Sequence, residues 1–270
     1  MGEAASAWAP LRSRETWPSS SRRCKSSASD ETVKTSKGIR LSTRSDPRRT
    51  RLAGGVVSAG ESRLREDIVL AARSLYDRGL THGSTGNISA RVDDGWLLTP
   101  TGSNLGRLDP ARLSKLDWNG RLLAGDPPSK EMQLHLAVYQ ERSESGAVVH
   151  LHATHSVAVS ILPDRDPDDV MPPLTAYYVM RIGTLPMIPY FAPGDAALAE
   201  AVRVVARRHH AVLLANHGPV VGGKSLDAAC DAIEELEATA RLFLLVRQEA
   251  KPLRVLTADQ VADLQRRFPR

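Results

Sequence analysis

The sequence predicts an α/β fold in which a single domain, a central β-sheet flanked by helices, follows an N-terminal tail that does not fold. Segments with helical periodicity alternate with short apolar strands over about 210 residues, which is typical of one α/β domain. Hydrophobic residues make up 41% of the 270-residue chain and charged residues 25%, so an ordinary core can form. We expect the tail to span residues 1–60 and the domain to span residues 61–270.

The tail differs from the domain in composition. Residues 1–52 contain 12 Lys and Arg but only 5 Asp and Glu, and they are rich in Ser and poor in aliphatic side chains. Such a segment buries too little apolar surface to offset the entropy lost on ordering, so we predict a disordered basic tail. The rest of the chain contains 24 basic and 26 acidic side chains, so the net charge of +5 comes from the tail. The domain gives no reason to expect binding to nucleic acid.

Other interpretations of the tail remain open. Its abundance of Arg and Ser fits an organellar targeting segment, and its first six residues fit a myristoylation pattern. Its basic runs could also tether the protein to nucleic acid or to a membrane, although no aromatic residue interleaves them. No stretch approaches the roughly 18 consecutive apolar residues of a transmembrane helix, and only two cysteines, Cys24 and Cys230, are present. We therefore expect a cytoplasmic protein with neither nucleic-acid nor membrane partners.

The domain is predicted to begin with a helix over residues 61–78, where apolar side chains recur at helical spacing and Gly79 can end the helix. Two short strands follow, over 88–92 and 95–99, joined by a turn that contains Gly95. Further along the chain, the same patterns predict helices over 130–141, 196–208, 225–249 and 257–267 and buried strands over 148–152 and 212–215.

The most informative stretch is the histidine cluster at the end of the strand over residues 148–152. Side chains at positions i and i+2 of a strand point to the same face, so His150 and His152 can bind one cation together. His217 follows another buried strand and can supply a third imidazole. Neutral imidazoles with a carboxylate suit a divalent ion such as zinc. His155 falls on the opposite face or beyond the strand, where we expect a structural role.

Three loops of small polar residues suggest a phosphate site. They are residues 83–89, 99–104 and 127–131, which combine glycines with hydroxyl, amide or ammonium donors. Backbone amides in such loops and at a helix N-terminus bind phosphate oxygens. No nucleotide-binding fingerprint is present, so the sequence does not support a nucleotide cofactor.

Taken together and in this order, these motifs resemble the class II aldolase/adducin family over about residues 61–268. The resemblance rests on Gly86-Asn87-Ile88-Ser89, Thr99-Pro100-Thr101, Ser129-Lys130-Glu131, His150-Leu151-His152 and Asn216-His217-Gly218. Within the family, further stretches such as Leu174-Thr175-Ala176-Tyr177-Tyr178 resemble the 3-oxo-tetronate 4-phosphate decarboxylases most closely. The family fold is a central sheet flanked by helices, usually in a homotetramer with active sites near subunit interfaces.

The resemblance implies roles for individual residues. Glu131 corresponds to the catalytic carboxylate, which also reaches the metal in some members, and Tyr177 corresponds best to a catalytic tyrosine, with Tyr178 adjacent. The metal ligands would be Glu131, His150, His152 and His217, and the substrate and phosphate positions would be Gly86, Asn87, Thr101, Gly102, Ser129 and Lys130. Related aldolases have Ser-Ser-Glu where this chain has Ser129-Lys130-Glu131, which argues against a simple aldolase.

The expected reaction is metal-dependent decarboxylation of a small phosphorylated sugar acid, 3-oxo-tetronate 4-phosphate. A divalent cation, zinc by preference, would stabilise the enediolate that forms as carbon dioxide leaves, and protonation would give dihydroxyacetone phosphate. Glu131 and Tyr177 would carry protons, and Lys130 would hold the substrate carboxylate or phosphate. Two alternatives remain: a class II sugar-phosphate aldolase, epimerase or dehydratase, and a non-catalytic adducin-like interaction module.

Overall fold

The computed structural model describes residues 58–248 and 252–269. The chain divides into two units, Met1–Leu52 and Ala53–Arg270, and every described residue belongs to the second. The predicted disordered tail therefore lies outside the described residues up to position 57. The last three residues of the predicted tail, 58–60, are described. The first helix, α1 (Ala59–Asp77), begins two residues before position 61, where the domain is predicted to start.

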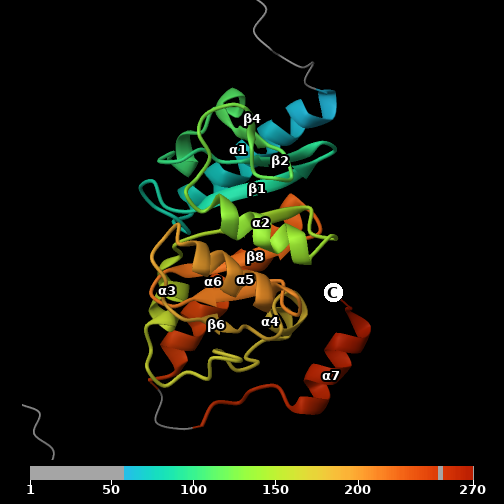
Figure 1. Ribbon diagram of the computed structural model, residues 1–270. Helices are drawn as coiled ribbons and strands as arrows, with labels where there is room; N and C mark the ends of the chain where they lie inside the picture. The colour runs from blue at the N-terminus through green and yellow to red at the C-terminus, as the bar shows by residue number, and fades with distance from the viewer. Residues whose placement is uncertain (1–57, 249–251, 270) are drawn as a thin grey trace, which may run out of the picture. The chain divides into compact units, whose positions relative to one another are not determined.

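One mixed sheet forms the centre of the domain (Figure 1). Its order is β4-β3-β2-β1-β5-β8-β7-β6. All neighbouring strands are antiparallel except β6 and β7, which are parallel. The strands are β1 (Asn87–Val92), β2 (Gly95–Leu98), β3 (Ser114–Leu116), β4 (Leu122–Ala124), β5 (Ala147–His150), β6 (Met187–Ile188), β7 (Ala211–Leu214) and β8 (Gly218–Gly223).

Helices cover both faces of the sheet, as the sequence predicts. The remaining helices are α2 (Met132–Glu141), α3 (Thr154–Ser160), α4 (Ala176–Arg181), α5 (Ala196–Ala206), α6 (Leu226–Val246) and α7 (Ala258–Arg267), with 3₁₀ turns at Leu105–Arg107 and Pro110–Arg112. On one face, α1 and α6 pack against the sheet in a core that includes Ile68 and Ile233. On the other face, α2 and α5 enclose a second core around Trp96 and Val202.

Local sequence signals account for where several helices begin. Ser58, Ser225 and Thr257 each precede a helix, and their hydroxyl oxygens accept hydrogen bonds from backbone N–H groups of the first turn. Gln260 completes a capping box with Thr257 at the start of α7. At the start of α5, the carboxylate of Asp195 accepts a hydrogen bond from the backbone N–H of Ala197. The long amphipathic helices thus begin close to the predicted positions, with α6 at Leu226 rather than 225.

The strand predicted over residues 148–152 ends at His150, so the strand-alternation argument does not extend to His152. Pairing of β5 with β8 stops at His150, and α3 begins at Thr154. Several elements had no sequence prediction. β3, β4 and β6 are two or three residues long, too short for an alternation pattern, and α3 and α4 have seven and six residues. β8 contains three glycines and a proline, a composition typical of turns.

No helix in the described ranges is both long enough and apolar enough to cross a lipid bilayer.

Candidate metal and substrate site

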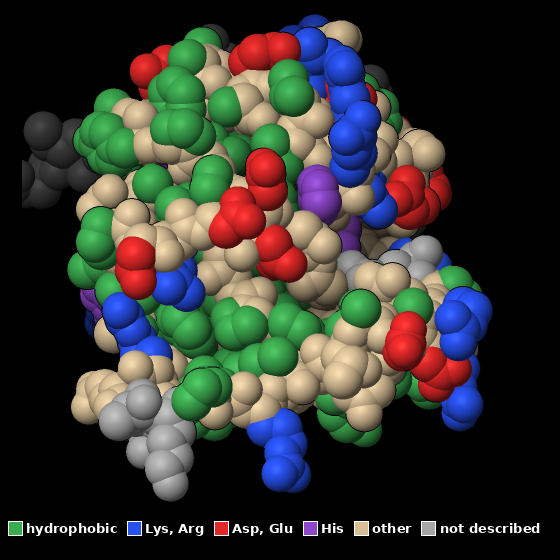
Figure 2. Space-filling model, turned by 90° about the horizontal axis from the view of Figure 1, so that it is seen from below, with side chains coloured by type: hydrophobic (Ala, Val, Ile, Leu, Met, Phe, Trp, Pro, Cys, Tyr) green, Lys and Arg blue, Asp and Glu red, His purple; other side chains and the backbone are tan. Residues whose placement is uncertain are grey.

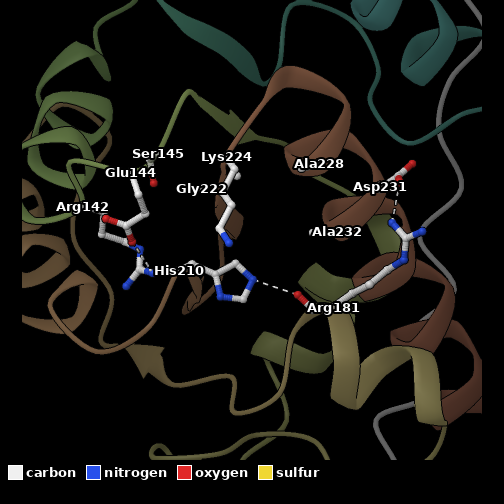
Figure 3. Close-up of a pocket in the computed structure, with 11 residues that line it drawn as sticks. Arg142, Glu144, Ser145, Arg181, His210, Gly222, Lys224, Ala228, Asp231 and Ala232 are labelled. Carbon is white, nitrogen blue, oxygen red and sulfur yellow. Dashed lines mark hydrogen bonds and ion pairs between the residues drawn. The ribbon is translucent and has the colours of Figure 1, made fainter. Parts of the chain in front are cut away.

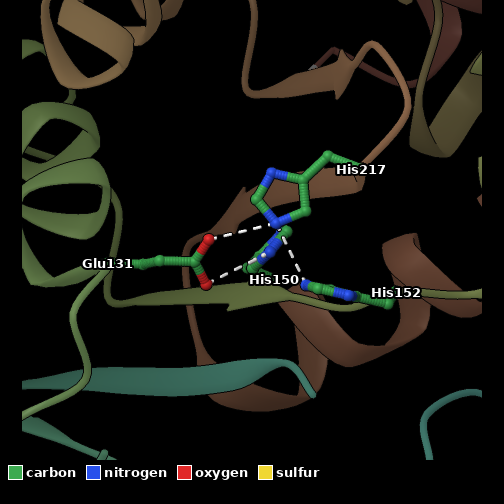
Figure 4. Close-up of side chains that lie close together, drawn as sticks. All are labelled: Glu131, His150, His152 and His217. Atoms are coloured by element: carbon green, nitrogen blue, oxygen red, sulfur yellow. Dashed lines mark hydrogen bonds and ion pairs between the residues drawn. The ribbon is translucent and has the colours of Figure 1, made fainter. Parts of the chain in front are cut away.

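Three histidines and one glutamate converge at one edge of the sheet (Figure 4). His150 is the last residue of β5, and His152 lies two residues later in the loop before α3. His217 lies in the turn between β7 and β8, and Glu131 immediately precedes α2. One ligand atom from each residue lies within 4.8 Å of the other three. The structure therefore brings together all four predicted metal ligands.

Close backbone approach makes this convergence possible. A Cβ atom at Gly218 would lie 2.2 Å from the carbonyl oxygen of Leu151, so only glycine allows the β7–β8 turn to sit against the His152 loop. Asn216 adopts a left-handed conformation with φ of 57°, which asparagine tolerates better than most residues. Its N–H donates to Ser160 Oγ at 3.0 Å, and this fixes the turn that carries His217.

The distances within the group are those of ligands around a shared centre. His217 Nε2 lies 3.0 Å from His152 Nε2 and 3.1 Å from Glu131 Oε1. His150 Nε2 lies 3.4 Å from Glu131 Oε2. His150 Nδ1 lies 2.8 Å from the carbonyl oxygen of Pro219, an acceptor that places the ring proton on Nδ1. The lone pair of His150 Nε2 therefore faces the centre of the group.

The group has the features of a cation site. Within the described part of the chain, Glu131 Oε1 and His150 Nε2 are buried and make no hydrogen bond. Burial lowers the pKa of His150, and burial with the neighbouring His150 and His217 lowers the pKa of His152 to about 3, so both rings are neutral at neutral pH. Burial opposes ionisation of Glu131, but His150, His217 and Asn87 hold its pKa below the usual range. A carboxylate beside neutral imidazoles is one of the donor sets that bind divalent metals of the zinc type.

The three small-residue loops lie together beside this group. Asn104 Nδ2 donates to the carbonyl oxygen of Gly83 at 2.6 Å, and Thr101 N donates to the carbonyl oxygen of Pro127 at 3.0 Å. Gly86 approaches the end of β5 so closely that a Cβ atom there would lie 2.9 Å from the carbonyl oxygen of His150. The predicted substrate positions Gly86, Asn87, Thr101, Gly102, Ser129 and Lys130 all lie on these crosslinked loops or at their ends.

Asn87 makes contacts that the sequence analysis did not foresee. Its Nδ2 donates to Glu131 Oε2 at 2.7 Å and to Ser129 Oγ at 3.2 Å, so its amide contacts the predicted catalytic carboxylate as well as a predicted phosphate residue. Behind it lies a buried histidine of α2, His135, whose Nε2 contacts Asn87 Oδ1. The one sequence signal for His135 was its position four residues after Glu131, which places both on one face of a helix.

Glu237 of α6 supports the loop that carries His152. Its Oε1 accepts from the backbone N–H of His155 at 2.8 Å and contacts His155 Nδ1 at 2.7 Å. Its Oε2 accepts from Ser156 N at 2.8 Å and Ser156 Oγ at 2.7 Å. One carboxylate therefore holds the first turn of α3 from 81 or 82 residues away, and His155 has the expected structural role rather than a place among the ligands.

The two adjacent tyrosines of α4 have different environments. Tyr178 is buried, with 1% of its surface exposed, whereas Tyr177 is 61% exposed. Tyr177 lies on a surface cavity of about 700 Å³ with His155 and Glu237, and it is not among the converging ligands. Lys130, the neighbour of Glu131, is also exposed. Of the two tyrosines, only Tyr177 therefore presents its side chain at the surface of the chain.

A second cavity, of about 270 Å³, contains none of the predicted site residues (Figure 3). Arg142 and Arg181 line it, but each is paired with a carboxylate, Glu144 at 2.7 Å and Asp231 at 2.6 Å. Its positive charge is therefore largely balanced within the cavity walls.

Comparisons with known proteins show the family of this chain. The family described as "Class II Aldolase and Adducin N-terminal domain" matches residues 66–244. A 3-oxo-tetronate 4-phosphate decarboxylase from Pectobacterium atrosepticum is 48% identical over 207 residues, covering 76% of this chain and 94% of that protein. Its counterpart from Cupriavidus necator is 51% identical over 187 residues, covering 69% and 86%. The crystal structure of YgbL from Escherichia coli has a TM-score of 0.74 and 46% sequence identity, covering 76% of this chain and 99% of that chain. The chain belongs to the class II aldolase and adducin family.

Proposed function

We propose that the protein is a metal-dependent carboxy-lyase that converts 3-oxo-tetronate 4-phosphate to dihydroxyacetone phosphate and carbon dioxide. The convergence of Glu131, His150, His152 and His217 within 4.8 Å carries this proposal, because a non-catalytic module has no use for it. Decarboxylases of this name at 48% and 51% identity support the choice of substrate. The two-cysteine composition supports a cytoplasmic location for the reaction.

The small-residue loops would bind the C4 phosphate. The backbone at Gly86 and Gly102 and the hydroxyls of Thr101 and Ser129 are donors within this loop cluster, and Asn87 Nδ2 holds Ser129 Oγ in place at 3.2 Å. Lys130, at the entrance to α2, would hold the C1 carboxylate until it leaves. Holding both ends of the substrate leaves the C2 and C3 oxygens directed at the histidines.

Glu131 would carry out the proton transfer. When the C1–C2 bond breaks, its electron pair passes toward the C3 carbonyl, and C2 must then gain a proton to become the hydroxymethyl carbon of the product. A divalent cation bound by the histidines would act as a Lewis acid for the charge that develops on the C3 oxygen. Because Glu131 is ionised, it would first take up a proton from water at Oε1, which makes no hydrogen bond to the described residues, and then pass that proton to C2.

Zinc is the metal that we propose. Four ligand atoms placed about 2.0–2.1 Å from a zinc ion in a tetrahedron stand about 3.3 Å apart. The contacts of His217 Nε2 with His152 Nε2 at 3.0 Å and with Glu131 Oε1 at 3.1 Å are close to this separation, and one ligand atom from each of the four residues lies within 4.8 Å of the others. Three imidazoles and one carboxylate also favour zinc over magnesium or calcium, which prefer oxygen ligands.

A homotetramer is the proposed assembly, with Tyr177 serving the site of a neighbouring subunit as the second proton carrier. Tyr177 is exposed and lies apart from the ligands of its own chain. Exposed large apolar side chains, including Leu122, Leu245 and Phe268, are available for subunit contacts. Figure 2 shows one face of the protein on which apolar side chains gather in wide areas between charged ones.

The deciding experiment measures metal content and products on the same purified sample. We expect stoichiometric zinc, and equal yields of carbon dioxide and dihydroxyacetone phosphate from one C2 epimer of 3-oxo-tetronate 4-phosphate. His217→Gln should lose metal and activity, because it removes one ligand. His209→Gln, which changes a histidine outside the group, should keep both.

Each other outcome points to one of the alternatives. Bound metal without release of carbon dioxide would replace the decarboxylase with an aldolase, epimerase or dehydratase. Absence of both metal and turnover would favour an adducin-like interaction module.

A further inference from the structure

A chain of buried polar groups runs from Glu131 away from the metal ligands into the core. Asn87 Nδ2 lies 2.7 Å from Glu131 Oε2, and Asn87 Oδ1 contacts His135 Nε2. His135 Nδ1 lies 2.7 Å from Ser89 Oγ, which lies 2.8 Å from the hydroxyl of Tyr139. Each of these side chains is at least nine-tenths buried. No step of the proposed reaction uses the chain beyond Asn87.

The directions of these hydrogen bonds follow from the carboxylate at one end. An ionised Glu131 only accepts, so the Asn87 amide must turn its nitrogen toward Oε2 and its oxygen toward His135. His135 Nε2 must then carry the ring proton and donate it. A neutral ring with its proton on Nε2 has a free lone pair on Nδ1, which accepts from Ser89. Ser89 Oγ in turn accepts from Tyr139. Reversing any one bond alone would place two acceptors or two donors opposite each other at a neighbouring bond of the chain.

We propose that His135 is a positioning residue that locks the amide of Asn87 in the orientation that binds Glu131. This inference rests on the proposed function of Glu131. The consequence for the reaction is that Oε2 is held by an N–H donor throughout, so the catalytic proton can reside only on Oε1. Oε1 is the oxygen 3.1 Å from His217 Nε2.

The fold supplies the alignment without any loop. Asn87 and Ser89 are two residues apart on β1 and point to the same face of the sheet. His135 and Tyr139 lie four and eight residues after Glu131, on the face of α2 that covers β1. The two-residue repeat of β1 and the nearly four-residue repeat of α2 therefore bring Asn87 and Ser89 alongside His135 and Tyr139, so that each donor meets an acceptor. The burial of His135 lowers its pKa to about 3, which keeps the ring neutral.

The first test observes the tautomer directly. Nitrogen-15 NMR of labelled histidine side chains, on the protein as purified and after metal removal, distinguishes a ring protonated on Nε2 from one protonated on Nδ1. The resonance that disappears in a His135→Gln variant identifies His135. We expect a single neutral tautomer with the proton on Nε2 between pH 6 and 9. A ring protonated on Nδ1 would overturn the proposal, whatever the enzyme catalyses.

The second test compares two amide replacements at position 135. The longer side chain of His135→Gln can still donate to Asn87, whereas His135→Asn is too short and retains only the contact with Ser89. We expect His135→Asn to weaken metal binding, measured by competition with a chelator, by roughly 10-fold or more, as loss of a supporting partner typically does. It should lower kcat with little change in KM, because the phosphate loops are untouched. His135→Gln should recover most of both losses.

Thr239→Val is the control for stability alone. It removes a buried hydroxyl that donates to Glu235 on α6 at 3.2 Å, outside the site. If His135→Asn lowers Tm as Thr239→Val does but leaves metal affinity and kcat unchanged, His135 is structural and the proposal is wrong. If the wild type releases no carbon dioxide while the tautomer and metal-affinity results hold, the proposed reaction fails and the positioning role stands. If His135→Asn does not fold, the NMR result decides.

Discussion

Lys130 is the residue at which this chain departs from the Ser-Ser-Glu sequence of related aldolases. It is exposed and directly precedes Glu131, and we propose that its ammonium group holds the carboxylate of the substrate. We predict that Lys130→Ser raises KM for the acid substrate about 10-fold, the usual cost of losing one hydrogen bond to a charged group. The loss should be absent for dihydroxyacetone phosphate as a competitive inhibitor, because it has no carboxylate. Equal weakening of both ligands would instead assign Lys130 to the phosphate.

His135 also makes stability depend on pH. Its pKa is about 3 in the folded protein because of burial, and the usual value in the unfolded chain is 6.5. Between these values only the unfolded chain takes up the proton, so the free energy of unfolding falls as pH decreases from about 6.5 toward 3. Urea unfolding of the metal-free protein across this range should show the decrease. His135→Gln should have a flatter profile, and identical slopes would show that other groups cause the effect.

At the scale of single elements, the binding of α3 by Glu237 sets the position of His152. Glu237→Gln keeps the shape but replaces one acceptor oxygen with an NH₂ group facing donors of His155 or Ser156. We predict a loss of about 1–3 kcal/mol in the free energy of unfolding, the cost of a buried unsatisfied group, and weaker metal binding through His152. Thermal unfolding and chelator competition measure the two effects. Glu234→Gln is the matched control, because Glu234 lies on the same helix in an exposed pair with Arg78, which contributes little.

The contact between Glu237 and α3 illustrates why local features could be predicted from the sequence and long-range ones could not. The periodicity of α1 and α6 and the motif residues around His150 and His217 are local signals, and they located the helices and the side chains that converge. The end of β5 is set by its pairing with β8, a strand whose glycines and proline are typical of a turn. It also depends on Glu237, which lies 82 residues from His155 in the sequence. The prediction that His150 and His152 meet was therefore correct, although the extended strand on which it relied was wrong. The sequence did not predict a role for His135, because that role depends on its contact with Asn87, which lies 48 residues away in the sequence.

At the scale of the whole molecule, the proposed tetramer predicts that active sites are shared between subunits. A Glu131→Gln chain still presents Tyr177, and a Tyr177→Phe chain still presents Glu131, so each variant alone is impaired in every site. In tetramers reassembled from equal amounts of both, about one site in four would combine a wild-type glutamate with a wild-type tyrosine from its neighbour. Mixing the two variants should therefore restore up to about a quarter of wild-type carbon dioxide release. Glu131→Gln mixed with the double variant is the control, since no site in that mixture has Glu131. If mixed tetramers form, as native mass spectrometry would show, and activity does not return, Tyr177 does not act across the subunit interface.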